Sequence, residues 1–151
     1  RREMDLSAEI DGPTKGQRAP TARRWGVLLA FWLASASNAV LGIGFAPIAA
    51  EIQRYYTEEQ WKVDVCLTSS YMIGFIVMIG PCCKFLDSYG LFAGVLAGTL
   101  ATAVGGWVRF LGSGRSGFWW VVLGQAMAAG GQPFLFNTPA ALSAQWFPPS
   151  E

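Results

Sequence analysis

The sequence predicts an all-α integral membrane protein in which four helices cross the lipid bilayer. Two observations support this fold class. Hydrophobic residues make up 52% of the chain and charged residues only 14%, whereas soluble domains carry roughly 25% charged residues. Between residues 25 and 147, apolar stretches with no ionisable side chain deep inside them alternate with short charged or glycine-rich connectors. We expect the four helices over residues 25–50, 66–86, 91–110 and 118–147.

The composition also excludes several classes of function. The formal net charge of +1 gives no support to nucleic-acid binding, which requires a concentrated basic surface. The chain has no histidine, which is the commonest metal ligand and the usual proton carrier near neutral pH. Its cysteines, Cys66, Cys82 and Cys83, all lie in the second apolar stretch and suit small packing residues. We therefore expect no metal, no cofactor and no enzymatic activity.

Residues 1–22 are expected to form a disordered cytoplasmic tail, ahead of a membrane domain over residues 23–151. The tail mixes charges of both signs with Pro13, Gly16 and Pro20. It has too little apolar surface to offset the entropy cost of ordering. Because the chain begins at an arginine and stops just after a hydrophobic helix, we expect it to be a fragment of a longer protein.

The first helix, over residues 25–50, follows Arg23 and Arg24 directly. Its length exceeds the roughly 20 residues that cross a bilayer core. A cleaved signal peptide would have a shorter apolar region that begins near residue 1. The next segment, residues 51–64, carries four acidic and two basic side chains, so we expect a water-facing connector there.

The second and third helices are expected to be antiparallel neighbours joined by a very short turn around Asp87 and Gly90. In the third helix small residues recur every four positions, at Gly94, Gly98, Thr102 and Gly106. Such a strip lets neighbouring helices approach closely. We interpret it as a packing surface within the bundle; homodimerisation or a moving interface is the alternative.

A loop with Arg109 and Arg115 precedes the fourth helix, which Pro133 and Pro139 should kink. The distribution of basic residues predicts the orientation. With a cytoplasmic tail, seven basic residues lie inside and four outside, and cytoplasmic loops carry the excess of Lys and Arg. The inside set is Arg1, Arg2, Lys15, Arg18, Arg23, Arg24 and Lys84, and the outside set is Arg54, Lys62, Arg109 and Arg115.

Polar amides inside the predicted helices are the candidates for binding a solute. Gln125 and Gln132 are seven residues apart, which places them on one face of the fourth helix. Each could bond a neighbouring helix. The functional alternative is that Gln132, beside Gly130, Gly131 and Pro133, lines a central cavity, where freed backbone is tolerated at membrane depth.

The first helix contains a further polar side chain that could bind a solute, and the short turn contains a candidate gate. Asn38 lies one turn before Gly42, and packing explains this pair about as well as binding does. Asp87, followed by Gly90, can cap a helix and form a bond that another conformation breaks. This is our candidate gate. No Asp, Glu, Lys or His lies mid-membrane, so no proton relay is predicted within these helices.

Taken in order, a set of short motifs resembles the feline leukaemia virus subgroup C receptor-related family of major facilitator transporters. The motifs are RRW at 23–25, SNA at 37–39, FAP at 45–47, VD at 63–64, Tyr71, LDSYGL at 86–91, GGWVRF at 105–110, GQ at 124–125, QPF at 132–134 and SAQWFPP at 143–149. The resemblance covers nearly all of the chain that we expect to be ordered.

The resemblance implies a twelve-helix carrier made of two six-helix halves that expose a midplane solute to each side in turn. This chain would supply helices one to four of the first half, and the remaining helices would be its partners, together with the lipid bilayer. It implies transport of a choline-like or ethanolamine-like solute, with haem or a vitamin less favoured. By position, Gln132 matches a glutamine that contacts choline in characterised members.

Two departures from the family pattern affect the expected site. Choline-binding members have a tryptophan in the first helix where this chain has Gly42, and a cation gains about 2 kcal/mol over a desolvated indole. Phe45 is the nearest aromatic that could replace it. Phe92 follows LDSYGL where the family usually has an arginine, which weakens the expected charged gate.

We therefore interpret the chain as the amino-terminal part of a plasma-membrane transporter for a small organic solute. The candidate site residues are Gln132, Asn38, Gly42 and Gln125 for the solute, and Asp87 and Gly90 for gating. The alternative is a non-transporting four-helix membrane protein that acts as a receptor or assembly subunit, with the amides serving only packing.

Overall fold

The structure is a computed structural model that describes residues 23–146 of the chain. The predicted tail over residues 1–22 lies outside the described residues, as do residues 147–151. All regular elements between residues 23 and 146 are helical, which confirms the all-α prediction. In chain order they are α1 (Arg23–Ile43), η1 (Ala46–Ile48), α2 (Ala49–Tyr56), α3 (Gln60–Val63), η2 (Asp64–Thr68), α4 (Ser70–Leu111), α5 (Phe118–Phe136) and α6 (Pro139–Trp146).

The helix expected over residues 25–50 is broken in two. α1 ends at Ile43, and the amide of Gly44 donates to the carbonyl of Val40 at 2.9 Å. Pro47 lies inside the short 3₁₀ turn η1 and has no amide hydrogen to continue an α-helical ladder. α2 then carries the helical path on to Tyr56, into the segment that we expected to be a connector.

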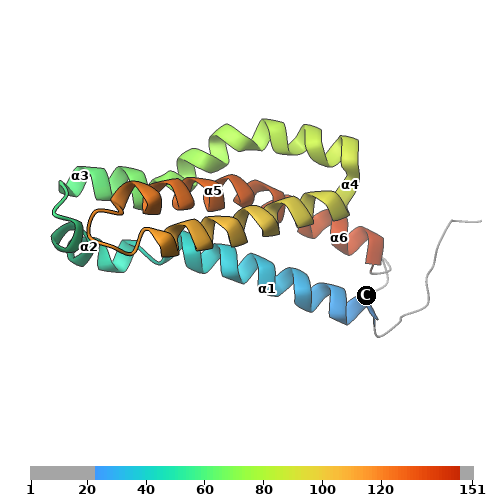
Figure 1. Ribbon diagram of the computed structural model, residues 1–151. Coiled ribbons are helices and arrows are strands. Elements are labelled where there is room, and N and C mark those ends of the chain that lie inside the picture. The colour runs from blue at the N-terminus through green and yellow to red at the C-terminus, as the bar shows by residue number, and fades with distance from the viewer. Residues whose placement is uncertain (1–22, 147–151) are drawn as a thin grey trace, which may run out of the picture.

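The second predicted helix starts earlier and the turn after it is shorter than expected. α3, the π-helical turn η2 and α4 follow one another with little interruption from Gln60 onward. α4 doubles back at Gly90, whose φ of 81° and ψ of 174° are accessible essentially to glycine alone. It therefore has a first leg over residues 70–89 and a second leg over residues 91–111 (Figure 1). Asp87 lies within the first leg and not in a loop.

The helix expected over residues 118–147 is interrupted near its end. α5 continues through Pro133 and ends at Phe136. The hydroxyl of Thr138 donates to the carbonyl of Phe134 at 2.6 Å, and Pro139 begins α6. Of the two prolines that we expected to kink the helix, Pro139 thus marks the interruption, whereas Pro133 is accommodated inside α5.

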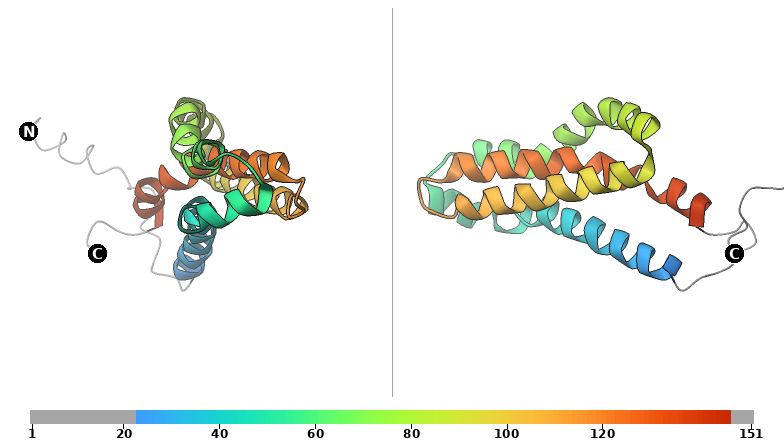
Figure 2. Two further views of the ribbon diagram at one scale, coloured as in Figure 1. Left: turned by 90° about the vertical axis from the view of Figure 1, so that its left-hand side faces the viewer. Right: turned by 45° about the vertical axis from the view of Figure 1, so that its right-hand side comes forward.

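The helices form an elongated bundle with two distinct ends (Figures 1 and 2). The start of α1, the Gly90 turn and α6 lie at one end, which we call the Gly90 end. α2, α3 and the loop over residues 112–117 lie at the other, the α2–α3 end. The hydroxyls of Tyr55 and Tyr56 donate to the carbonyls of Ser113 and Gly112 at 2.9 and 3.0 Å. These two bonds tie α2 to the loop before α5.

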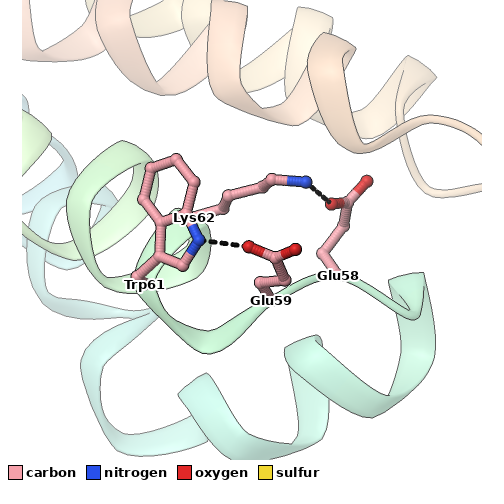
Figure 3. Close-up of polar contacts among 4 residues, drawn as sticks. All are labelled: Glu58, Glu59, Trp61 and Lys62. Atoms are coloured by element: carbon pink, nitrogen blue, oxygen red, sulfur yellow. Dashed lines mark hydrogen bonds and ion pairs between the residues drawn. The ribbon is translucent and has the colours of Figure 1, made fainter.

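Polar contacts at the α2–α3 end are formed mainly by the segment between α2 and η2. The ammonium of Lys62 donates to a carboxylate oxygen of Glu58 at 2.9 Å, and the indole of Trp61 donates to Glu59 (Figure 3). Yet Ile52 and Val63 of the same region are buried in an apolar cluster with Phe118. The predicted connector is therefore a folded cap with charged side chains on its outer surface.

The second leg of α4 packs against α5 through glycines on both helices. A Cβ atom built on Gly105 would lie 2.6 Å from the carbonyl oxygen of Gly124, and one on Gly124 would lie 2.5 Å from that of Gly105. One on Gly131 would lie 2.7 Å from the carbonyl oxygen of Gly98. The small-residue strip thus serves helix packing within the chain, which is the reading that we favoured from the sequence.

The burial pattern is the reverse of that in a soluble domain. Large apolar side chains face outward, with Phe92 81% exposed and Met72 74% exposed, while Asn38 is 2% exposed and Gln125 is fully buried. Two helical segments of the described chain are long and apolar enough to cross a membrane, Arg24–Tyr56 and Gln60–Leu111. The second segment includes both legs of α4. The count of four crossings stays a prediction.

Candidate functional site

Asn38 joins three helices at the centre of the bundle. Its amide nitrogen donates to the hydroxyl oxygen of Thr102 and to the carbonyl of Ala128, both at 2.9 Å. Thr102 in turn donates to the carbonyl of Gly98 at 2.8 Å. The side chain therefore links α1 to the second leg of α4 and to α5. These contacts support the packing alternative for Asn38, and the binding alternative stays a prediction.

Gln125 holds the π-helical turn η2 against α5. Its amide nitrogen donates to the carbonyl of Leu67 at 2.8 Å, and the hydroxyl of Ser70 donates to the same carbonyl at 3.1 Å. A π-helical turn disturbs the regular backbone ladder, so the carbonyl of Leu67 is available to partners from outside its helix. The side-chain oxygen of Gln125, Oε1, is buried without a partner among the described residues.

Gln132 has a buried side-chain oxygen that none of the described residues bonds. It lies two turns beyond Gln125 on α5, beside Gly131, which packs on Gly98, and Pro133, which is buried. A buried amide oxygen without a partner costs about 1–3 kcal/mol. Such a group is suited to accept a hydrogen bond from a solute or from a further part of the protein.

Gly42 lies under the ring of Tyr71 and not beside open space. A Cβ atom built on Gly42 would lie 2.8 Å from two ring carbons of Tyr71. Tyr71 comes from the first leg of α4 and packs with Ala128, Ala129 and Leu41. The absence of a side chain at Gly42 therefore makes room for an aromatic ring that a different helix supplies. The hydroxyl of Tyr71 is buried without a partner among the described residues.

The two gating candidates lie together at the Gly90 end. Asp87 is exposed on the last turn of the first leg, and Gly90 forms the reversal three residues later. No contact of the Asp87 carboxylate with another described residue is seen. Gly90 has open space around its Cα atom, so its role in the chain is conformational.

One residue that our sequence reasoning placed in a loop has a defined position in the structure. Arg109 lies in the last turn of α4 and points back toward the break in α1. Its guanidinium donates to the carbonyl of Leu41 at 3.0 Å and lies 4.0 Å from the centroid of the Phe45 ring. The ring that we considered as a cation-binding surface is thus covered by a cation of the chain itself. The spacing of residues in the sequence does not show that Arg109 bonds to a carbonyl near the end of α1.

The candidate residues lie apart from a groove on the surface of the bundle. This groove, of about 1020 Å³, lies between α1 and the second leg of α4 and is lined mostly by apolar side chains such as Trp32, Val40 and Trp107. None of the six predicted site residues lines it. Asn38, Gln125 and Gly42 contact neighbouring helices. The side-chain oxygens of Gln125 and Gln132 are both buried without a partner among the described residues, but Gln125 is anchored to Leu67 through its amide nitrogen.

Comparison with known proteins identifies relatives over most of the chain. An uncharacterised MFS-type transporter of Caenorhabditis elegans is 34% identical over 129 residues, which is 85% of this chain and 22% of that protein. The choline/ethanolamine transporter FLVCR1 of Felis catus is 31% identical over 141 residues, or 93% of this chain and 25% of that protein. Solute carrier family 49 member A3 of Xenopus tropicalis is 29% identical over 136 residues. No protein-family model matches the chain.

The matched region covers a similar share of the chain in all three relatives. The chain spans about a quarter of the length of the relatives it matches, while the matched region covers 83% or more of the chain itself in these three cases. The relatives share one description, that of solute transporters. The chain is therefore a homologue of the feline leukaemia virus subgroup C receptor-related family of major facilitator transporters, to which its ordered motifs pointed.

Proposed function

We propose that the chain forms part of a membrane transporter that moves a small organic solute by alternating access. The observation that carries the proposal is the side-chain oxygen of Gln132, which is buried without a partner among the described residues, in a bundle whose outer surface is apolar and whose relatives are named as transporters. Transport, rather than catalysis, suits such a site, because an amide can bind a solute and does not readily transfer protons.

The burial pattern supports placement in a membrane. Contiguous exposed apolar surface is rare in soluble monomers, whereas lipid solvates it. In the described residues the charged side chains gather at the two ends of the bundle. Five of the six exposed tryptophans in this part of the chain lie near helix ends, whereas Trp32 lies in the middle of α1; the five are Trp25, Trp61, Trp107, Trp119 and Trp120. Tryptophan is enriched at membrane interfaces. We infer four crossings, by α1, the two legs of α4, and α5.

The arrangement of the charged residues supports one orientation in the proposed bilayer. The start of α1 and the Gly90 turn lie at one end (Figure 1), so Arg24 and Lys84 share one side of the proposed bilayer. An inside amino terminus places these charges, together with those of residues 1–22, in the cytoplasm, in accord with the positive-inside tendency. The plasma membrane is the proposed location.

The proposed solute is choline-like or ethanolamine-like, because the relative FLVCR1 is named as a choline/ethanolamine transporter. Gln132 is the proposed contact to the solute hydroxyl, because its free side-chain oxygen can accept a hydrogen bond from that hydroxyl. Asn38 and Gln125 would shape the site indirectly, by holding α1 and η2 against α5. Gly42 would contribute by admitting the Tyr71 ring.

The remaining helices of the longer protein are the proposed partners of the bundle, and Asp87 with Gly90 the proposed gate. Asp87 is exposed at the Gly90 end, so its carboxylate can reach a donor on another part of the transporter. Because Gly90 fixes the reversal of α4, it would hold that carboxylate at a constant position while the partner moves.

Uptake by the full-length protein that contains this chain tests the proposal. Cells expressing wild type, Gln132→Ala or the matched control Gln60→Ala, an exposed amide in α3, are given labelled choline and ethanolamine. We expect uptake to fall about tenfold or more in Gln132→Ala, as loss of a buried hydrogen bond of about 1.4 kcal/mol predicts. The control should keep wild-type uptake.

The outcomes separate the two candidate functions. Equal uptake by Gln132→Ala and wild type, at matched surface abundance, would remove Gln132 from the solute site. Uptake of neither solute by a wild-type protein that reaches the surface would favour the alternative of a non-transporting receptor or assembly subunit.

A further inference from the structure

The break between α1 and η1 brings together three groups that attract a positive charge. The first is the carbonyl of Leu41, one of the last carbonyls of α1, which helix geometry leaves without an intrahelical partner. The second is the carboxyl end of α1, where the helix dipole is negative. The third is the face of the Phe45 ring, whose π electrons attract cations.

A guanidinium occupies this place in the structure. Arg109 reaches it from the end of α4 and makes both contacts at once, a hydrogen bond of 3.0 Å to the carbonyl of Leu41 and a stacking distance of 4.0 Å to the Phe45 ring centroid. The two contacts come from different residues of the break. The arrangement therefore recognises an N–H donor and a delocalised charge together.

The surroundings hold the Arg109 side chain in place. The Cγ atom of Arg109 lies within 2.7 Å of where a Cβ atom of Gly124 would be, so any larger residue on α5 would displace its stem. The ring of Tyr71 covers Gly42 on the same turn of α1. The guanidinium is thus held between α1, α4 and α5 and does not extend freely into solvent.

We infer that the break in α1 is a binding site for organic cations that carry N–H donors, and that Arg109 is its internal occupant. Guanidinium ions and primary ammonium ions can donate to Leu41 and lie against Phe45. A quaternary ammonium has no N–H and can use the ring alone. If Arg109 is removed, the site becomes available to an external cation of the first kind.

A consequence for solute choice rests on the proposed function. The ammonium group of a primary amine such as ethanolamine can compete with Arg109 for both contacts, whereas the ammonium group of choline has no N–H and can compete only for the ring. Solute entry at this point would then release the end of α4 from α1. Cation binding at the break in α1 does not depend on transport. An experiment can therefore disprove the binding site without disproving transport, or transport without disproving the site.

Binding of methylguanidinium to the purified full-length protein that contains this chain, in lipid nanodiscs, tests the inference, with tetramethylammonium as the probe that lacks N–H groups. In Arg109→Ala we expect methylguanidinium to raise the unfolding midpoint with a Kd of about 1 mM. Tetramethylammonium should bind at least about tenfold more weakly. Wild type should bind methylguanidinium at least about tenfold more weakly than Arg109→Ala does, because an external cation must first displace Arg109. The double variant Phe45→Leu/Arg109→Ala should lose the methylguanidinium response.

A second measurement on the unaltered site covers the case in which Arg109→Ala does not fold. Phenylglyoxal modification, read by mass spectrometry, should be slower at Arg109 than at Arg54, whose side chain is 78% exposed. Phe45→Leu should remove most of that difference. Three results would each overturn the inference. One is a folded Arg109→Ala variant that binds neither cation, and another is a wild type that binds methylguanidinium as well as the variant does. The third is unchanged protection of Arg109 in Phe45→Leu.

Discussion

The contact between Gly105 and Gly124 gives the sharpest stability prediction for this bundle. In Gly124→Ala the new methyl carbon would lie 2.5 Å from the carbonyl oxygen of Gly105 and 2.7 Å from both the amide nitrogen and Cγ of Arg109. Two of these three atoms belong to the backbone of α4 and cannot turn away as a side chain does. The helices themselves must therefore separate.

The size of the effect follows from these distances. An ordinary van der Waals contact begins at 3.4 Å, so the second leg of α4 and α5 must move apart locally by about 0.9 Å, the difference from 2.5 Å. The shift loosens the packing of Gly98 on Gly131 in the same interface. Overpacking of this kind costs about 1–3 kcal/mol.

Reversible unfolding of the chain in mixed micelles, with increasing sodium dodecyl sulphate and tryptophan fluorescence as the signal, measures this loss. The matched control is Gly80→Ala, because Gly80 lies in the first leg of α4 with no atom within 4 Å of an added Cβ. We expect Gly124→Ala to unfold at lower detergent fraction and Gly80→Ala to behave like wild type. Equal stability of the two variants would refute the backbone contact.

Two further substitutions test other contacts by the same assay. Asn38→Ala should lower the free energy of unfolding by about 1–2 kcal/mol, since it loses two interhelical hydrogen bonds. Ser37→Ala, next to it, loses only a bond within its own helix and should change stability little. Gly90→Ala should cost about 1–3 kcal/mol through backbone strain at positive φ. It has open space around it, so a loss no greater than that of Gly80→Ala would contradict the strain argument.

The fold class was readable from the sequence because it depends on where apolar and charged residues fall along the chain. The alternation of apolar stretches and polar connectors predicted the helices, and the regular spacing of Gly94, Gly98 and Thr102 predicted a close helix contact. The ordered motifs also pointed to the correct family. These features are local, or nearly so, and need no knowledge of which helices meet.

The helix boundaries were predicted less well. Pro47 and Gly44 end α1 early, while residues 49–56 extend the helical path because Ile52 finds a buried place against Phe118. The acidic and basic residues of the predicted connector suggested a loop. The connector is nevertheless largely helical, with one buried side chain in α2, Ile52, and one in α3, Val63. Tertiary packing at the α2–α3 end overrode the local signal.

The roles of the polar residues were decided only by the tertiary structure. Sequence spacing placed Gln125 and Gln132 on one face of a helix. The π-helical turn η2 gives the amide nitrogen of Gln125 a backbone partner, whereas the side-chain oxygens of both residues have none among the described residues. Likewise, only the approach of α4 to α1 shows that Arg109 covers Phe45. The sequence determined that this chain is a helical membrane-type protein of a transporter family, because hydropathy is a property of each segment. Which polar group remains free to bind depends on contacts between segments, and these exist only once the helices have packed.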